Sequence, residues 1–474
     1  MSRLELLSRN IGLAILLATA SLVAHAQCTF PPSASSAYDP DANAGAGAIH
    51  LPWRTDLPSA PGTSVFAWQG VRFESDWRDY MAAFLKEIRA SGIHIDQRRL
   101  TMNPNAEWWI VPWMDYSLNG RERLNGLTAE RGPDPGDLSK TSGNGIQTWA
   151  VGWYNRPGAY AIGQIFKDPC NPQAPATFAF PAQSASFKFL FTTADVGQVP
   201  YLEGSPEIDA YINPEGDPRG EKAGVNGREP RPMRLLQVDI AVKDPNAKDT
   251  GWVMGTFVWR KPLSPDGFKG DWLLDNLVPV GLMWGNDPGA LDPVWNKTTT
   301  LSQSKINQEL RGVVWSASEA DWPQRPYPGF QGRLNGPADN PRSSCLACHA
   351  AAQWRRDQPL VDSFKLDSSF TPEKVRAHVS KFFMNTQGGT RHPGSMVGNP
   401  LDYSLQLEAA FDRICRACSD QKLQARTPDI CKVPQVRNRG TIVTRDTCEA
   451  SPVVNFFKTF VKPEALSETP YPRQ

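Results

Sequence analysis

Residues 235–242 read LLQVDIAV, an alternation of apolar and polar side chains that suits an extended strand. One face of that strand would carry Leu236, Val238, Ile240 and Val242, and the other Gln237, Asp239 and Ala241. Gly and Pro turns separate it from six further runs of strand composition, at residues 107–111, 147–154, 159–166, 186–192, 252–259 and 277–284. Because no regular helices lie between most of these runs, they predict an antiparallel, sandwich-like unit.

A helix is expected near the start of this unit. Between Trp77 and Ile88, six large apolar residues recur at helical spacing, with Ser75 as the N-cap and Gly92 as the stop. The first part of the chain is therefore expected to be rich in β-structure, with this helix beside the strands.

Composition changes sharply near residue 330. Residues 27–330 carry a net charge of −6 and 15 of the 16 Trp, whereas residues 331–474 carry +6 and six of the eight Cys. Gly and Pro around residues 329–340 suggest a linker. After it, Thr371 and Asp402 resemble the N-caps of two amphipathic helices. The expected fold class is α+β, with a β-rich domain at residues 27–330 and a helical domain at residues 331–474.

The first 26 residues have the pattern of an export signal. Arg3 and Arg9 precede a 13-residue apolar run, and Ala24 and Ala26 form a cleavage site. We expect cleavage after Ala26 and a mature protein in the periplasm. No later stretch is long and apolar enough to predict a transmembrane segment. A net charge of +1 gives no reason to expect nucleic-acid binding.

Residues 345–349 read CLACH, which is the C-x-x-C-H pattern of covalent c-type haem attachment. Two thiols at this spacing, Cys345 and Cys348, can reach the two vinyl groups of one porphyrin, and His349 is carried beneath the iron as the proximal ligand. The alternatives are a redox-active dithiol, a zinc half-site and an ordinary disulfide. A single covalent haem c is the cofactor that the pattern favours.

From Pro337 onward the sequence resembles the cytochrome c family. The resemblance implies that Cys345 to Trp354 is the haem-binding helix, that residues 393–396 form a ligand loop, and that Asp402 to Cys415 is the closing helix. It also implies electron transfer as the function. The whole chain resembles large single-haem cytochromes of bacterial periplasms, which assigns no substrate.

The distal iron ligand has several candidates. Met396 is preferred, because it lies in a Pro-Gly loop before the closing helix. Met384, His378 and His392 are the alternatives, together with an open position.

The other cysteines predict disulfides in an oxidising compartment. We expect two bridges among Cys415, Cys418, Cys431 and Cys448, with three possible connectivities. Cys415 and Cys418 do not predict a second haem, because Ser419 follows them instead of His. Cys28 and Cys170 are left as a possible pair.

The preferred function is electron transfer by an exported single-haem cytochrome. The alternative is a haem-dependent oxidoreductase, of oxidase or peroxidase type, or a haem sensor with an open distal site. A redox partner protein is expected in either case. Eight basic residues against two acidic ones between Arg413 and Arg445 favour an acidic partner, although a solvated basic loop explains them equally well.

Overall fold

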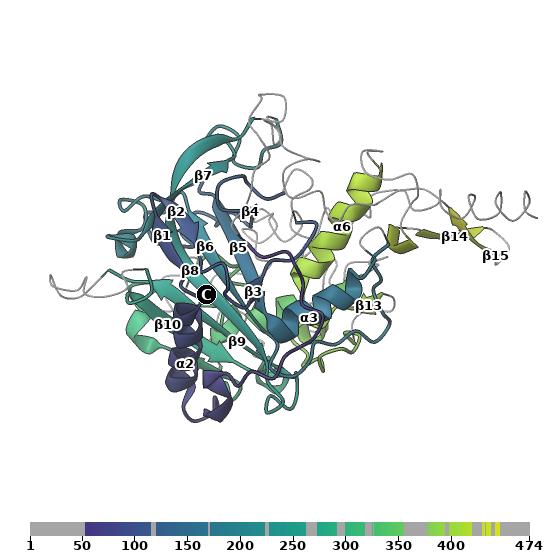
Figure 1. Ribbon diagram of the computed structural model, residues 1–474. Helices are drawn as coiled ribbons and strands as arrows, with labels where there is room; N and C mark the ends of the chain where they lie inside the picture. The colour runs from purple at the N-terminus through teal and green to yellow at the C-terminus, as the bar shows by residue number, and fades with distance from the viewer. Residues whose placement is uncertain are drawn as a thin grey trace, which may run out of the picture.

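The computed structural model describes most of the chain between residues 53 and 445. The described residues are 53–114, 120–168, 171–222, 227–261, 273–291, 299–317, 325, 327–354, 377, 379–393, 398–419, 429–431, 433–437 and 441–445. For residues 416–419, 433–437 and 441–445 only the backbone is described. The chain folds as a mixed α and β protein dominated by one large antiparallel sheet (Figure 1).

Nine strands form this sheet. Its main path runs β11-β10-β9-β8-β6-β5-β3, so most neighbours in space are also neighbours in the sequence. The 15-residue strand β8 is the longest, and it pairs with β6 on one edge and with β7 and β9 along the other. The alternation at residues 235–242 thus lies in the middle of the sheet. The strands are β3 (Trp108–Trp109), β4 (Thr128–Ala129), β5 (Thr148–Asn155), β6 (Ala185–Thr192), β7 (Glu207–Ile212), β8 (Glu229–Lys243), β9 (Trp252–Trp259), β10 (Leu277–Met283) and β11 (Ser304–Ile306).

The remaining described elements are three small sheets, the α-helices and single helical turns. Three two-stranded sheets pair β1 with β2, β12 with β13, and β14 with β15. These strands are β1 (His94–Asp96), β2 (Arg99–Thr101), β12 (Gln353–Trp354), β13 (Asn399–Pro400), β14 (Val433–Arg437) and β15 (Thr441–Arg445). The α-helices are α2 (Trp77–Ala90), α3 (Arg156–Ile165), α4 (Cys345–Ala350) and α6 (Leu405–Ser419). Single turns of 3₁₀-helix are η2 (Ala67–Gly70), η3 (Pro200–Leu202), η5 (Pro288–Ala290), η6 (Gln308–Leu310), η8 (Phe330–Gly332) and η9 (Asp429–Cys431).

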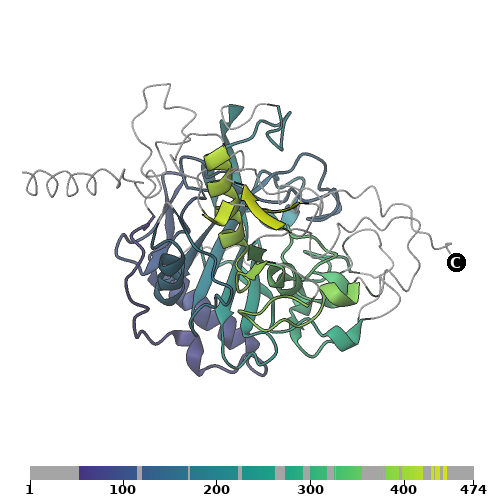
Figure 2. The same cartoon turned by 90° about the vertical axis from the view of Figure 1, so that its right-hand side faces the viewer.

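Protein covers both faces of the sheet. Every residue of β5 and β9 is buried. Helix α2 lies against one face, where a Cβ atom on Gly255 would come within 2.5 Å of the Met81 sulfur. The segment before α4 lies against the other face, where a Cβ atom on Gly281 would meet Leu334. The sheet is therefore a middle layer, with α2 and the C-terminal elements on opposite sides (Figures 1 and 2).

The C-terminal elements share the core of the sheet. Leu346 of α4 and Phe411 of α6 belong to the same cluster of buried apolar side chains as the strands. The Phe411 ring lies 6.0 Å from the ring of Phe166 at the end of α3. The division of the chain at residue 330 stays a prediction from composition, and the segments on its two sides pack directly on one another.

Three local expectations are corrected. The haem-binding helix expected from Cys345 to Trp354 ends at Ala350, and Trp354 lies in strand β12. Residues 159–166 lie in helix α3 up to Ile165, not in a strand: the Asn155 side chain accepts a hydrogen bond from the Gly158 N–H, and Pro157 occupies the first turn. This is an N-cap signal that the apolar run concealed. Asp402 does not cap the closing helix, which begins at Leu405 with the Ser404 hydroxyl accepting from the Leu407 N–H.

Other expectations hold or fall outside the described residues. The helix expected from Trp77 is confirmed as α2, although its N-cap is Asp76 rather than Ser75. The expected start at Thr371 lies outside the described residues, and residues 379–382 are helical. The described strands form one large sheet with small pairs beside it, so the sandwich-like form is not seen among them.

Candidate cofactor site

The motif at residues 345–349 lies on α4, and the start of that helix is fixed by polar bonds. The Ser344 hydroxyl accepts from the Ala347 N–H at 3.1 Å and donates to the Asn286 side-chain oxygen at 2.8 Å. The Cys345 N–H donates to the Leu334 carbonyl. These bonds connect α4 to the turn after β10 and to the segment that covers the sheet.

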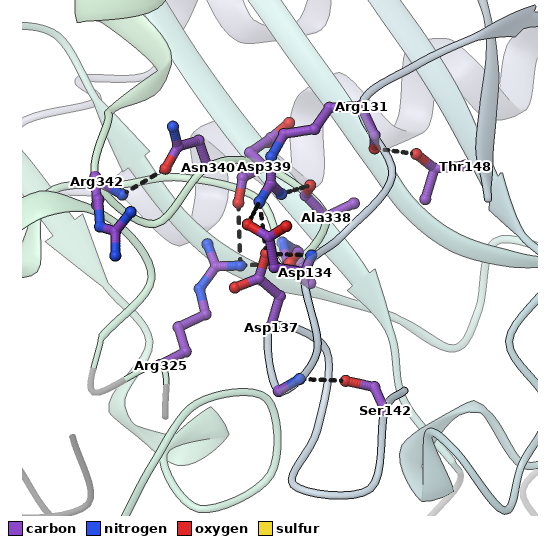
Figure 3. Close-up of polar contacts among 12 residues, drawn as sticks. Arg131, Asp134, Asp137, Ser142, Thr148, Arg325, Ala338, Asp339, Asn340 and Arg342 are labelled. Carbon is purple, nitrogen blue, oxygen red and sulfur yellow. Dashed lines mark hydrogen bonds and ion pairs between the residues drawn. The ribbon is translucent and has the colours of Figure 1, made fainter. Parts of the chain in front are cut away.

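Buried arginines hold the loop before α4. Arg131 donates to the Ala338 carbonyl and pairs with Asp134 and Asp137 (Figure 3). Arg325 donates to several backbone carbonyls of the same loop, Gly336 among them. The carbonyl oxygens of this loop thus accept hydrogen bonds from guanidinium groups, in place of the backbone N–H groups that serve as donors in strands and helices. The loop is thereby tied to the segment after β4.

The three motif side chains share one arc of α4. With about 100° per residue in an α-helix, Cys348, Cys345 and His349 fall within about 100° of the circumference. The main core covers the side of Leu346 and Ala350, and a second apolar cluster covers the side of Ala347. Both cysteines and the histidine keep part of their surface accessible. The two thiols and the imidazole therefore face the same way.

Neither thiol of the motif forms a disulfide, although the protein makes one elsewhere. Burial raises the pKa of Cys345 well above its usual range, and the carboxylates of Asp339 and Asp239 raise it further. A dithiol that exchanges disulfides needs a lowered pKa, because the thiolate is the nucleophile. The setting of Cys345 therefore disfavours the redox-dithiol interpretation.

The bond made by His349 fixes its tautomer. Its Nδ1 lies 2.8 Å from the Tyr403 carbonyl oxygen, which can only accept, so Nδ1 carries the proton. Burial lowers the pKa of His349, and the carbonyl bond opposes that shift. The neutral ring leaves the lone pair on Nε2 available for a metal. A ring nitrogen that donates to a backbone carbonyl while the other coordinates is the usual arrangement of a metal-ligating histidine.

A polar row crosses the sheet beneath α4. Register places Gly152, Lys188, Asp239 and Thr256 side by side on β5, β6, β8 and β9. Lys188 lies 3.4 Å from Asp239, which also accepts from the Thr256 hydroxyl at 2.9 Å. Gly152 leaves room for α6, because a Cβ atom there would meet the Gln406 side chain at 2.6 Å. Charged and polar side chains thus lie side by side on this face of the sheet.

Burial changes the acidity of this row. Desolvation raises the pKa of Asp239 to about 6, Lys188 opposes that rise, and Asp339 adds to it. The two carboxylates share the Gln237 amide, which donates to Asp239 at 3.0 Å and to Asp339 at 3.3 Å. Asp339 and Asp239 both act on the Cys345 thiol, so the row borders the candidate site.

The distal candidates are only partly described. Met396 and His378 lie outside the described residues. Met384 is 36% exposed, and its backbone carbonyl accepts from the Asn286 side chain, which also bonds Ser344 at the start of α4. It follows the apolar cluster of Phe382, which also packs against Cys348. His392 is buried. The arrangement brings the Met384 segment close to α4 and leaves the preference for Met396 a prediction.

One of the expected disulfides is present. Cys415 at the end of α6 is bonded to Cys431 in η9. The side chains of Cys418 and Cys448 lie outside the described ones, as do Cys28 and Cys170. If a second bridge forms among the four C-terminal cysteines, it joins Cys418 to Cys448. Most of the basic segment between residues 413 and 445 also lies outside the described side chains.

Sequence reasoning missed the groups that surround the motif. Tyr403 supplies a backbone carbonyl, which no residue type signals. Lys188 and Asp239 could have been noticed as charges inside otherwise apolar strands, and Ser344 as an N-cap before a helix. The charges in the strands and the N-cap serine thus carry a signal in the sequence, whereas the carbonyl of Tyr403 does not.

Three general findings complete the description of the site. Among the described residues, no helix combines the length and the hydropathy needed to cross a membrane. In the same part of the chain, no three His, Cys, Asp or Glu side chains are grouped so that they could hold a metal ion. Compared with known proteins, the chain matches no family model, no curated protein and no solved structure.

Proposed function

We propose that this protein is an exported electron-transfer protein with one haem c. The haem would be bound covalently by Cys345 and Cys348, with His349 as its proximal ligand and Met396 as its distal ligand. The observation that carries the proposal is the state of His349, whose Nδ1–H is held by the Tyr403 carbonyl so that Nε2 keeps its lone pair. The proximity of both thiols on the same arc of α4 supports it.

The residues present fit such a group. Each thiol would add across one vinyl group, with its sulfur forming the new C–S bond and its hydrogen passing to the neighbouring vinyl carbon. The bound haem would supply one-electron chemistry at its iron. The protein would orient the imidazole through Tyr403 and exclude water through the apolar cluster beside Ala347.

Location and partners follow from the same proposal. The export signal would direct the protein to the periplasm, and the oxidising conditions there suit the Cys415–Cys431 bridge. The finer architecture that we propose is a cytochrome c-like helical unit built on α4 and α6, which packs against the sheet. The sheet would then serve as a platform for the haem, and a redox protein would be the exchange partner.

Covalent attachment is tested on the exported protein after denaturation. We expect haem staining to persist on a denaturing gel, to weaken in Cys345→Ala or Cys348→Ala, and to vanish in the double variant. The Cys415→Ala/Cys431→Ala double variant is the control, because it removes two sulfurs outside the motif without leaving a free thiol, and it should keep full staining. Haem that extracts into acidic organic solvent from the wild type would overturn the proposal.

The absorbance spectrum then separates electron transfer from the alternative. A low-spin spectrum with the weak red-edge band of Met–iron bonding would support electron transfer. A high-spin spectrum would indicate an open position and favour an oxidoreductase or a sensor. His349→Ala should lose the normal spectrum even where the thioethers survive.

A further inference from the structure

The carbonyl that holds His349 comes from a strained turn. Asp402 and Tyr403 both have positive φ values, 44° and 72°, and the Ser404 N–H donates to the Leu401 carbonyl across them. Two left-handed residues in succession are typical of type I′ turns, in which Gly, Asn and Asp dominate. A tyrosine there is unfavourable, so the surrounding structure must hold it.

Four hydrogen bonds from the sheet side fix the first residue of that turn. The side chain of Asp402 is completely buried. It accepts two contacts from Lys243 Nζ at 2.7 and 2.9 Å, one from Trp252 Nε1 at 2.8 Å, and one from the Phe180 N–H at 2.6 Å. A Cβ atom on Gly388 would collide with the lysine and the aspartate, so this glycine lets the chain close over the pair.

The second residue of the turn is fixed separately. The Tyr403 hydroxyl donates to the Thr386 carbonyl at 2.5 Å, and its ring lies 6.0 Å from the Trp252 ring. The Tyr403 carbonyl then remains for His349 Nδ1 at 2.8 Å. The orientation of the imidazole thus depends on a turn that is anchored at its other end to β8 and β9.

We propose that Asp402, with Lys243 and Trp252, positions the Tyr403 carbonyl against His349 and thereby sets the reduction potential of the haem. This inference rests on the proposed function. A close Nδ1–H···O=C bond makes the imidazole a stronger donor to the iron, which favours the ferric form. Loosening the anchor weakens that bond, so the potential rises. Asp402 is a positioning residue, because it acts through Tyr403.

The test compares variants whose charge changes have opposite signs. Asp402→Asn removes a negative charge and Lys243→Met removes a positive charge. Trp252→Phe removes the indole N–H donor and part of the buried ring without changing the charge. Positioning predicts a higher potential in all three. Asp402→Asn should shift the reduction equilibrium toward the ferrous form at least tenfold, about 59 mV for one electron, and Trp252→Phe severalfold. A simple charge effect predicts a lower potential in Lys243→Met and an unchanged potential in Trp252→Phe.

The control is Asp244→Asn. Asp244 follows Lys243 and is also buried, but it accepts from the Tyr80 hydroxyl of α2, on the other side of the sheet. The equilibrium constant for haem reduction in Asp244→Asn should stay within twofold of the wild-type value. All proteins are compared by redox titration at equal haem content, and Trp252→Phe keeps the test open if the charge variants fail to fold.

The outcomes separate the two proposals. A wild type without covalent haem would overturn the proposed function and this inference with it. Covalent haem with an unchanged potential in Trp252→Phe, or with opposite shifts in Asp402→Asn and Lys243→Met, would overturn the positioning role alone.

Discussion

The two faces of the central sheet differ in what they bury. On the α2 side, Phe187, Val238 and Gly255 belong to an apolar layer, in which the Phe187 ring packs edge to face on one tryptophan and at a tilt on another. On the α4 side, Lys188 and Asp239 occupy the neighbouring positions of the same strands. Adjacent residues of one strand thus serve an apolar core and a charged layer.

The composition of the α4 face therefore reflects more than stability. Buried charges cost free energy unless they are paired, and apolar residues in their place often stabilise a fold at least as well. On the α2 face, the neighbouring positions of the same strands are packed with apolar side chains. Because the charged row borders the candidate site, we interpret it as part of the environment of the site.

The largest expected effect concerns the α2 face. Phe187 is 1% exposed, and its ring lies 4.6 Å from that of Trp108 and 4.9 Å from that of Trp153. Phe187→Ala should lower the free energy of unfolding by about 3–5 kcal/mol, because it removes a buried ring and leaves a cavity. Urea denaturation measures the change. Haem staining of the folded fraction should stay normal. A loss of unfolding free energy below about 1 kcal/mol would show that this face is not the main source of stability.

The strands of both faces were predictable because strand periodicity is local. Residues 147–154, 186–192, 252–259 and 277–284 are confirmed as strands to within about a residue. The run at residues 159–166 failed because a short apolar segment does not distinguish a strand from a buried helix. The signal that resolves it, Asn155 followed by Pro157, lies outside the run itself.

The candidate site was predictable only in part. Cys345, Cys348 and His349 are consecutive enough to form a motif, and the structure places them on one helix. Their surroundings come from residues far away in the sequence: Tyr403 is 54 residues from His349, and Asn286 is 58 residues from Ser344. No local pattern specifies such pairs. The sequence therefore predicts a helix cap at Asp402, whereas the side chain of Asp402 bonds Lys243 in the turn that holds the histidine.

An intermediate effect is expected from the acidity of the α4 face. Asp239 has its pKa raised by burial to about 6, against an ordinary value of 3.8. Between about pH 4 and pH 6 the folded protein therefore keeps a proton that the unfolded chain has released. Asp239 thus contributes stability that is present below pH 4 and is lost as the pH rises to about 6.

Asp239→Asn should remove this pH dependence. The difference in unfolding free energy between wild type and variant should change across pH 4–6 by up to about 1.4 kcal/mol per pH unit. Denaturation at several pH values measures it. Phe187→Ala is the control on the other face, because it should shift the stability curve without changing its slope. Parallel curves for wild type and Asp239→Asn would contradict the assigned pKa.

The smallest effect is expected when the charged pair is replaced as a whole. Lys188 and Asp239 have side chains that are 25% and 22% exposed, so their attraction is partly screened and their desolvation incomplete. Lys188→Met alone leaves Asp239 and Glu130 without the cation between them and should be destabilising. The double variant with Asp239→Leu should return to within about 1 kcal/mol of the wild type, because it removes both desolvation costs. If its stability is unchanged while its haem potential moves, the charges serve the cofactor rather than the fold. If the double variant loses as much unfolding free energy as the two single variants together, the charged pair is required for the stability of the sheet. Both faces of the sheet would then serve stability, one through apolar packing and the other through an ion pair.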